Sequence, residues 1–153
     1  MKNIYKLKFE KSSFDLDKDY ESIPDHHKEK ISKIRPSAFV DFNDKVEDRY
    51  TLYMIMSQTE INEYISILKQ NSIAHRILDI SDEILRGEVE IDDHLMLNAN
   101  RFNKTKVLKF IDKKNEWIYD NLDIDTVLDR ISDVGMESLR HIEKKFLENY
   151  HID

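Results

Sequence analysis

The sequence predicts an α+β fold: a small mixed β-sheet with a βαβ unit and helices on one face, plus a C-terminal helical hairpin. Three observations lead to this class. Residues 3–10 alternate apolar and polar side chains, residues 49–80 follow a strand–helix–strand pattern, and residues 122–153 carry two apolar stripes separated by a glycine. The 153 residues suit one domain, with residues 1–121 as the α+β body and the hairpin packed on it.

The first predicted element is a half-buried strand. Tyr5, Leu7 and Phe9 share one face of residues 3–10, and lysines occupy the other face, which is the two-residue period of a strand. Three further elements are expected before the βαβ unit. They are a polar loop, a short helix that Pro36 ends, and a short strand, at residues 11–25, 25–34 and 37–44.

The βαβ unit begins with the apolar run 49–56, which predicts a central strand. Ser57 and Glu60 match a capping box, so a helix is expected over residues 58–70. Residues 73–80 predict the next strand, parallel to the first because a helix of about 13 residues connects them. Ser81 is then expected to cap a short helix.

Residues 105–119 are read as a β-hairpin, because the polar run 112–115 is typical of a turn. A helix is the alternative, since the apolar residues of this segment also fit a helical spacing. They are Val107, Phe110, Ile111 and Ile118.

The C-terminal hairpin is predicted from its caps and its apolar stripes. Asp123 or Asp125 caps the first helix, Gly135 closes it with left-handed backbone, and Ser138 caps the second. The stripes comprise Val127, Leu128, Ile131 and Val134, then Leu139, Ile142, Phe146 and Leu147. We expect these side chains to pack within the pair or onto the body.

Within the hairpin stand Leu128-Asp129-Arg130-Ile131, Gly135, Ser138-Leu139, and Glu143-Lys144-Lys145-Phe146-Leu147. Residues 125–150 thereby resemble a short helical segment at the C-termini of many Bacteroidetes proteins, which some rhomboid-type intramembrane proteases carry in their cytoplasmic tails. The resemblance implies a bacterial source. It assigns no activity, because the segment occurs on unrelated proteins. The chain departs from the pattern at residues 140–142, and residues 1–120 resemble no family.

Composition narrows the function classes. The chain has no cysteine, no signal-peptide pattern and no apolar run of membrane-span length, so a cytoplasmic protein without membrane contact is expected. The net charge of −7 disfavours general nucleic-acid binding. No metal or cofactor is expected: His26-His27 lacks further ligands, and residues 15–26 lack the glycine and glutamate of a calcium loop.

Charge is distributed unevenly. Residues 81–95 hold six acids against one base, residues 101–116 hold six bases against two acids, and residues 120–153 hold nine acids against four bases. Solvated faces with surface ion pairs are one interpretation, and an acidic patch that meets a basic partner is the other. The residues predicted to contact a partner are Asp82, Glu83, Glu88, Glu90, Asp92, Asp93, Asp129, Asp133 and Glu137.

These observations favour a non-catalytic protein-binding module, most concretely an acidic immunity-type protein that neutralises a toxin by binding its basic domain. One alternative is an enzyme or small-ligand binder whose site is assembled from scattered residues, such as His75, Asp79 and the strand at 49–56. Another is a subunit of a larger complex with an apolar interface. The sequence fixes neither the partner nor the oligomeric state.

Overall fold

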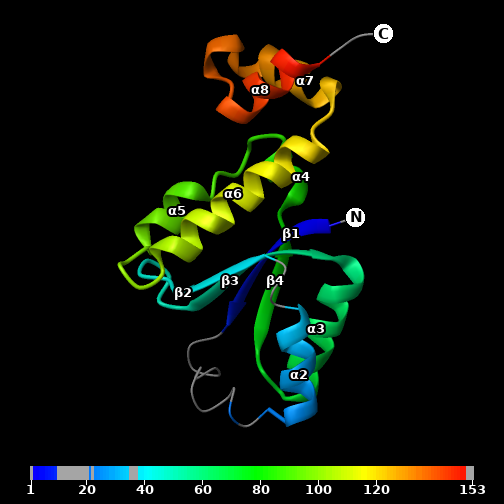
Figure 1. Ribbon diagram of the computed structural model, residues 1–153, viewed down its shortest axis with the longest axis vertical. Helices are drawn as coiled ribbons and strands as arrows, with labels where there is room; N and C mark the ends of the chain where they lie inside the picture. Colours follow the sequence, from blue (N-terminus) through cyan, green and yellow to red (C-terminus); the bar gives the residue numbers. More distant parts are fainter. Residues whose placement is uncertain (1, 10–20, 22, 35–37, 151–153) are drawn as a thin grey trace.

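The computed structural model describes residues 2–9, 21, 23–34 and 38–150, and it confirms the α+β class. Figure 1 shows a small sheet with helices on both of its faces and the C-terminal hairpin set on top of this body. Most of the polar loop predicted for residues 11–25, together with Glu10 and Pro36, lies outside the described residues. Among the described helices none has the length and apolar character needed to cross a membrane.

The sheet contains four strands in the order β2-β3-β1-β4. They are β1 (Lys2–Phe9), β2 (Phe39–Asn43), β3 (Tyr50–Ser57) and β4 (His75–Asp79). Both β3 and β4 pair with β1 antiparallel, so the two run in the same direction, as the predicted crossover requires. They are not neighbours, however, because β1 lies between them. The sheet is therefore antiparallel in every hydrogen-bonded pair and differs from the mixed pairing expected.

Each face of the sheet has its own hydrophobic cluster. Tyr5, Leu7 and Phe9 share one face, as predicted, and α2 (Asp25–Ile34) and α3 (Gln58–Gln70) pack there. Ile4 and Ile55 belong to the second cluster, on the other face, together with residues of α4 to α7. Helices thus cover both faces rather than one, because β3 buries seven consecutive residues and offers apolar side chains on each side.

The β-hairpin predicted for residues 105–119 is wrong, and the helical alternative is confirmed: α6 runs from Lys104 to Asn121. It follows α4 (Ser81–Leu85) and α5 (Asp92–Leu97). Its buried residues are Val107, Phe110, Lys114, Trp117 and Ile118, a helical spacing. The polar run 112–115 resembled a turn, but three of its residues occupy exposed or half-buried positions of the helix. The fourth, Lys114, is buried and forms an ion pair with Asp92.

The predicted caps have mixed outcomes. Ser57 and Glu60 form the capping box of α3, and Asp123 accepts a hydrogen bond from the Thr126 backbone N–H at 2.7 Å. Ser81 does not cap its helix. Its hydroxyl instead donates to the Asp79 carboxylate at 2.6 Å and accepts the Ile4 backbone N–H at 2.9 Å, which ties α4 to the sheet.

The C-terminal hairpin consists of α7 (Ile124–Val134), a 3₁₀ turn (Met136–Ser138) and α8 (His141–Asn149). Gly135 has φ +82° and ψ 159°, a positive-φ conformation almost restricted to glycine, although not the left-handed helical one expected. The N-cap of α8 is Arg140 rather than Ser138. Val127 and Leu139 are buried and belong to the same hydrophobic cluster as the α6 side of the sheet.

Candidate partner-binding surface

A buried ion cluster fastens the hairpin to the body. The Glu143 side chain is 0% exposed and accepts hydrogen bonds from Arg140 Nε at 2.9 Å and from Arg130 Nε at 3.3 Å. Burial by itself raises the pKa of the Glu143 carboxyl, but the hydrogen bonds from Arg140 and the charges of both arginines outweigh it and hold the pKa below its usual value. The carboxylate is therefore ionised at neutral pH.

Arg140 connects this cluster to the end of α4. Its Nη1 donates to the Ile84 carbonyl at 2.5 Å and its Nη2 to the Leu85 carbonyl at 2.8 Å. The last carbonyls of a helix lack partners within the helix and carry partial negative charge, so a guanidinium suits them. The hairpin is thus held by a directional contact as well as by apolar packing.

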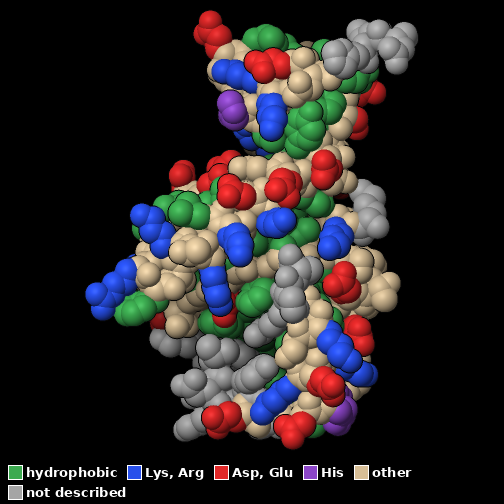
Figure 2. Space-filling model, viewed as in Figure 1, with side chains coloured by type: hydrophobic (Ala, Val, Ile, Leu, Met, Phe, Trp, Pro, Cys, Tyr) green, Lys and Arg blue, Asp and Glu red, His purple; other side chains and the backbone are tan. Residues whose placement is uncertain are grey.

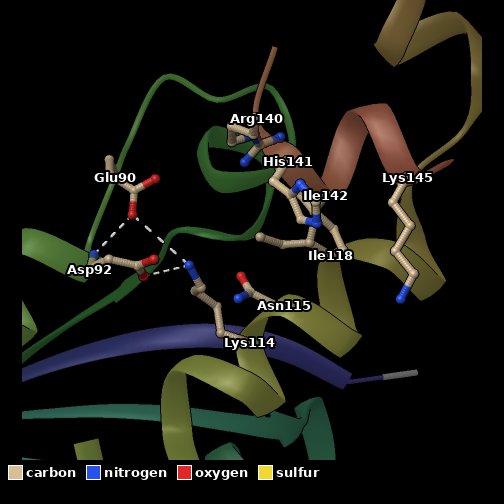
Figure 3. Close-up of a pocket in the computed structure, with 9 residues that line it drawn as sticks. All are labelled: Glu90, Asp92, Lys114, Asn115, Ile118, Arg140, His141, Ile142 and Lys145. Atoms are coloured by element: carbon tan, nitrogen blue, oxygen red, sulfur yellow. Dashed lines mark hydrogen bonds and ion pairs between the residues drawn. The ribbon is translucent and has the colours of Figure 1, made fainter. Parts of the chain in front are cut away.

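A groove lies between α6 and α8, directly beside this junction. One hollow, of about 330 Å³, is lined by Glu90, Asp92, Lys114, Asn115, Ile118, Arg140, His141, Ile142 and Lys145 (Figure 3). A second, of about 540 Å³, shares Asn115, Ile142 and Lys145 with it and continues past Asp112, Glu116, Tyr119 and Asp120. We call the two together the α6–α8 groove. Figure 2 shows acidic side chains in a row where the body meets the hairpin.

Lys114 lines the inner end of the groove. Its side chain is only 3% exposed, and its Nζ lies 2.5 Å from Asp92 Oδ1 and 3.9 Å from Glu90 Oε1. Figure 3 shows this amino group pointing to the two carboxylates and away from Lys145. A buried lysine is tolerated when it is paired in this way. Lys114 is accordingly neutralised within the chain.

The outer end of the groove combines aromatic and acidic groups. The Tyr119 ring lies 6.2 Å from the Phe146 ring, and Lys145 Nζ lies 5.5 Å from the centre of the Tyr119 ring. Asp112, Glu116 and Asp120 follow one another at intervals of four residues on α6, so they line one side of the helix. The groove therefore contains the apolar or aromatic side chains of Ile118, Tyr119 and Ile142 among polar and charged ones, and the three carboxylates of α6 lie along one side.

A smaller hollow of about 270 Å³ lies where α4 meets α7. It is lined by Arg86, Gly87, Glu88, Thr126, Asp129, Arg130, Asp133 and Val134. Gly87 has φ +70°, and a Cβ atom there would lie 2.6 Å from Arg130 Cζ. Glycine suits this position because its backbone φ is positive, and the Arg130 guanidinium that binds Glu143 also lies against it.

The predicted contact residues divide among these surfaces. Glu90 and Asp92 line the α6–α8 groove, whereas Glu88, Asp129 and Asp133 line the hollow at α4 and α7. The other four predicted residues line neither the α6–α8 groove nor the hollow at α4 and α7. They are Asp82, Glu83, Asp93 and Glu137. The sequence reading missed three groove acids, Asp112, Glu116 and Asp120, because it treated their segment as a β-hairpin. The helical spacing of the apolar residues in α6 is the signal that places these three acids on one side of a helix.

A second polar cluster links the β2–β3 turn to α5. The Tyr53 hydroxyl lies 2.8 Å from His94 Nδ1, and His94 Nε2 lies 2.8 Å from Asp44 Oδ2. Asp44 also accepts the backbone N–H groups of Val46 and Glu47. Burial raises the pKa of the Tyr53 phenol, and the charges of Asp44 and Glu47 raise it further. The raised pKa keeps the phenol protonated at neutral pH, and this chain of hydrogen bonds joins β3, the β2–β3 turn and α5.

Two residues named for the scattered enzyme site, His75 and Asp79, lie at opposite ends of β4. His75 and Asp79 stand four positions apart on β4, a separation of roughly 13 Å along a strand. Asp79 is occupied by Ser81 and Asn3, and the His75 ring contacts the Ile73 carbonyl at 2.9 Å. The part of the chain that the structure describes contains no group of three or more His, Cys, Asp or Glu side chains placed to hold a metal ion.

Comparison with protein-family models, with curated proteins and with solved structures finds no match to this chain. The surface itself therefore carries the functional argument.

Proposed function

We propose that the chain is a non-catalytic protein-binding module that recognises a basic segment of its partner. The observation that carries this proposal is the α6–α8 groove, which places a few apolar and aromatic side chains beside a row of carboxylates. Apolar side chains supply binding energy through burial, and the carboxylates supply charge complementarity. A partner segment with an apolar side chain between lysines or arginines has the matching chemistry.

The charge balance within the groove supports a basic ligand. Lys114 is paired with Asp92, and the Arg140 guanidinium is occupied by Glu143 and the carbonyls of α4. Asp112 and Asp120, in contrast, form no ion pair with any described residue. Lys145 also lines both hollows and forms no ion pair with a described residue, so Asp112 and Asp120 together exceed it by one negative charge. A cationic side chain of a partner therefore meets carboxylates that the chain compensates only in part.

More particularly, we propose an immunity-type protein that acts in the bacterial cytoplasm and neutralises a toxin by binding a basic surface on it. The net charge of −7 supports fast, electrostatically steered capture of such a partner. The bacterial setting rests on the resemblance of residues 125–150, and the cytoplasmic setting on the absence of cysteine.

The groove is tested with a synthetic peptide that contains phenylalanine between lysines. Titrated into ¹⁵N-labelled protein, it is expected to shift the amide resonances of Asn115, Tyr119 and Ile142. The double variant Asp112→Lys with Asp120→Lys is expected to weaken binding at least about tenfold, because two attractive charges become repulsive. Both residues are exposed, so the fold is retained.

The matched control is Glu29→Lys with Glu63→Lys. It makes the same change in net charge at two exposed positions on α2 and α3, on the opposite face of the sheet. Peptide affinity is expected to stay within about twofold, since charges farther away than a Debye length of ~8 Å are largely screened. Equal losses in both variants would show that net charge alone attracts the peptide and would refute a groove site.

The immunity role is tested by co-expression with toxin domains encoded beside this gene in its host. Rescue of growth by the wild type, and loss of rescue with the groove variant but not with the control, is the expected result. The association rate with the rescued toxin is expected to fall several-fold between about 50 and 300 mM salt. Failure of every adjacent domain to be neutralised would contradict the immunity role.

A further inference from the structure

The turn just before α6 exposes an aromatic side chain, Phe102, to solvent. This turn lies at the end of α6 that is farther from α7. Phe102 is 83% exposed. The Asn100 side chain accepts the backbone N–H groups of Phe102 and Asn103, at 2.8 and 3.1 Å. In return, the Asn103 side chain accepts the Asn100 backbone N–H at 2.7 Å and donates to the Asn98 carbonyl at 3.3 Å. The turn is therefore preorganised, which lowers the entropic cost of binding through it.

One basic group lies against this ring, and two exposed apolar side chains stand on segments that Lys45 joins nearby in the fold. The Arg101 guanidinium lies 4.8 Å from the centre of the Phe102 ring. Leu97 and Val46 are 54% and 71% exposed, and Lys45 joins their segments by donating to Asn98 and to the Leu97 carbonyl. We call Val46, Leu97, Arg101, Phe102 and Lys104 the Phe102 knob. Figure 2 shows basic and hydrophobic side chains together at this left-hand end of the molecule.

The composition of the knob is that of a binding anchor. Aromatic residues and arginine carry most of the energy in protein interfaces, and an aromatic side chain buries about 150–250 Å² when it is enclosed. Arg101 and Lys104 give the knob a positive rim. It thus presents the chemistry that the α6–α8 groove requires: an apolar centre flanked by cations.

We propose that the Phe102 knob of one copy docks in the α6–α8 groove of a second copy, so that the knob competes with the partner for the groove. This inference rests on the proposed function of the groove. The two complementary surfaces occupy different places on α6, one at its first turn and one along residues 112–120. Each contact therefore joins two unlike surfaces, and either a head-to-tail row of copies or a closed pair with two such contacts satisfies it.

The experiment uses two variants that each remove one half of the contact. Phe102→Ser removes the knob, and Asp112→Lys with Asp120→Lys removes the groove. By sedimentation velocity the wild type is expected to show association that increases with concentration and decreases with salt. Each variant alone is expected to be weakened at least about tenfold in self-association. Their mixture is expected to form a dimer that grows no further, because one intact knob meets one intact groove.

Met136→Ser is the control for Phe102→Ser, since Met136 is also exposed but lies in the hairpin turn. It is expected to associate as the wild type does. A wild type that remains monomeric at all concentrations would overturn the inference, as would a dimer that is lost in Phe102→Ser and not restored by mixing. Binding of the monomeric wild type to vesicles of phosphatidylglycerol, lost in Phe102→Ser, would assign the knob to anionic lipid instead.

Peptide binding separates this inference from the proposed function. The Phe102→Ser variant keeps a free groove, so it is expected to bind the lysine–phenylalanine peptide more tightly than the concentrated wild type does. Equal affinity of the two proteins at high concentration would refute competition by the knob while leaving the groove as a peptide site. No peptide binding by either protein would refute the groove itself, and with it both proposals.

Discussion

At the scale of single residues, Glu143 matters most to the position of the hairpin. It is buried, it accepts hydrogen bonds from two arginines, and one of those arginines also binds the end of α4. The carboxylate thus joins the two helices of the hairpin, and Arg140 joins them in turn to α4, 55 positions away. Removal of that charge leaves Arg130 and Arg140 without their shared partner, which is the costly way to break a buried ion pair.

Glu143→Gln is therefore expected to lower the free energy of unfolding by about 3 kcal/mol at pH 7. The folded-state pKa of Glu143 lies below its unfolded value, so its stabilisation is present above about pH 4.3 and is lost as the pH falls through the folded pKa. The measurement is urea denaturation of both proteins between pH 3 and 7. A stability difference that stays constant down to pH 3 would contradict the assignment.

At the scale of elements, local signals predicted more than long-range ones. The capping box of Ser57 and Glu60 and the Asp123 cap each involve residues three positions apart, so their patterns are visible in the sequence. Ser81 has the same side chain but bonds to Ile4, 77 positions away, and the sequence carries no trace of that partner. The contacts of His94 with Asp44 and Tyr53, 50 and 41 positions away, leave no local pattern in the sequence for the same reason.

The candidate site was predicted only in part, for a related reason. Five of the nine predicted acids line one of the two junction surfaces, since acidic segments flank the junction on both sides. The groove exists only because α6 passes beneath α8, and that crossing depends on tertiary packing. An amphipathic helix whose polar run contains a buried lysine is easily taken for two strands and a turn.

The contact between α4 and α7 gives a prediction at this scale. Gly87→Ala is expected to cost about 1–3 kcal/mol from backbone strain at φ +70°. A further loss is expected because the new Cβ displaces the Arg130 guanidinium from Glu143. In an Arg130→Ala background only the strain remains. A double-mutant cycle from chemical denaturation measures the difference, and purely additive effects would contradict the packing described.

At the scale of the whole molecule, the hairpin and the body share a hydrophobic cluster. Val127 of α7 and Leu139 belong to the cluster that contains Trp117 of α6. Trp117 is the only tryptophan in the chain, and its indole N–H donates to the Lys2 carbonyl at 2.7 Å. Its fluorescence therefore reports on the α6 face of the sheet, while far-UV circular dichroism reports on all helices.

The two signals are expected to give coincident urea transitions, because loss of the hairpin uncovers the same cluster that holds Trp117. In Glu143→Gln both transitions are expected at lower urea and still to coincide, because the hairpin and Trp117 share this cluster. Transitions that are already separate in the wild type would show that the hairpin unfolds independently of the body.

The central position of β1 has a consequence for the order of events during synthesis. Among the described strands, the first one pairs with β3 and β4, which follow it by more than 40 residues. At about 5–20 residues per second, a ribosome leaves Tyr5 and Leu7 without their strand partners for roughly 2–10 s. Lys6 and Lys8 alternate with them. Charged residues of this kind hinder strand pairing between nascent chains. The two lysines therefore reduce aggregation through β1 until β3 and β4 have been synthesised.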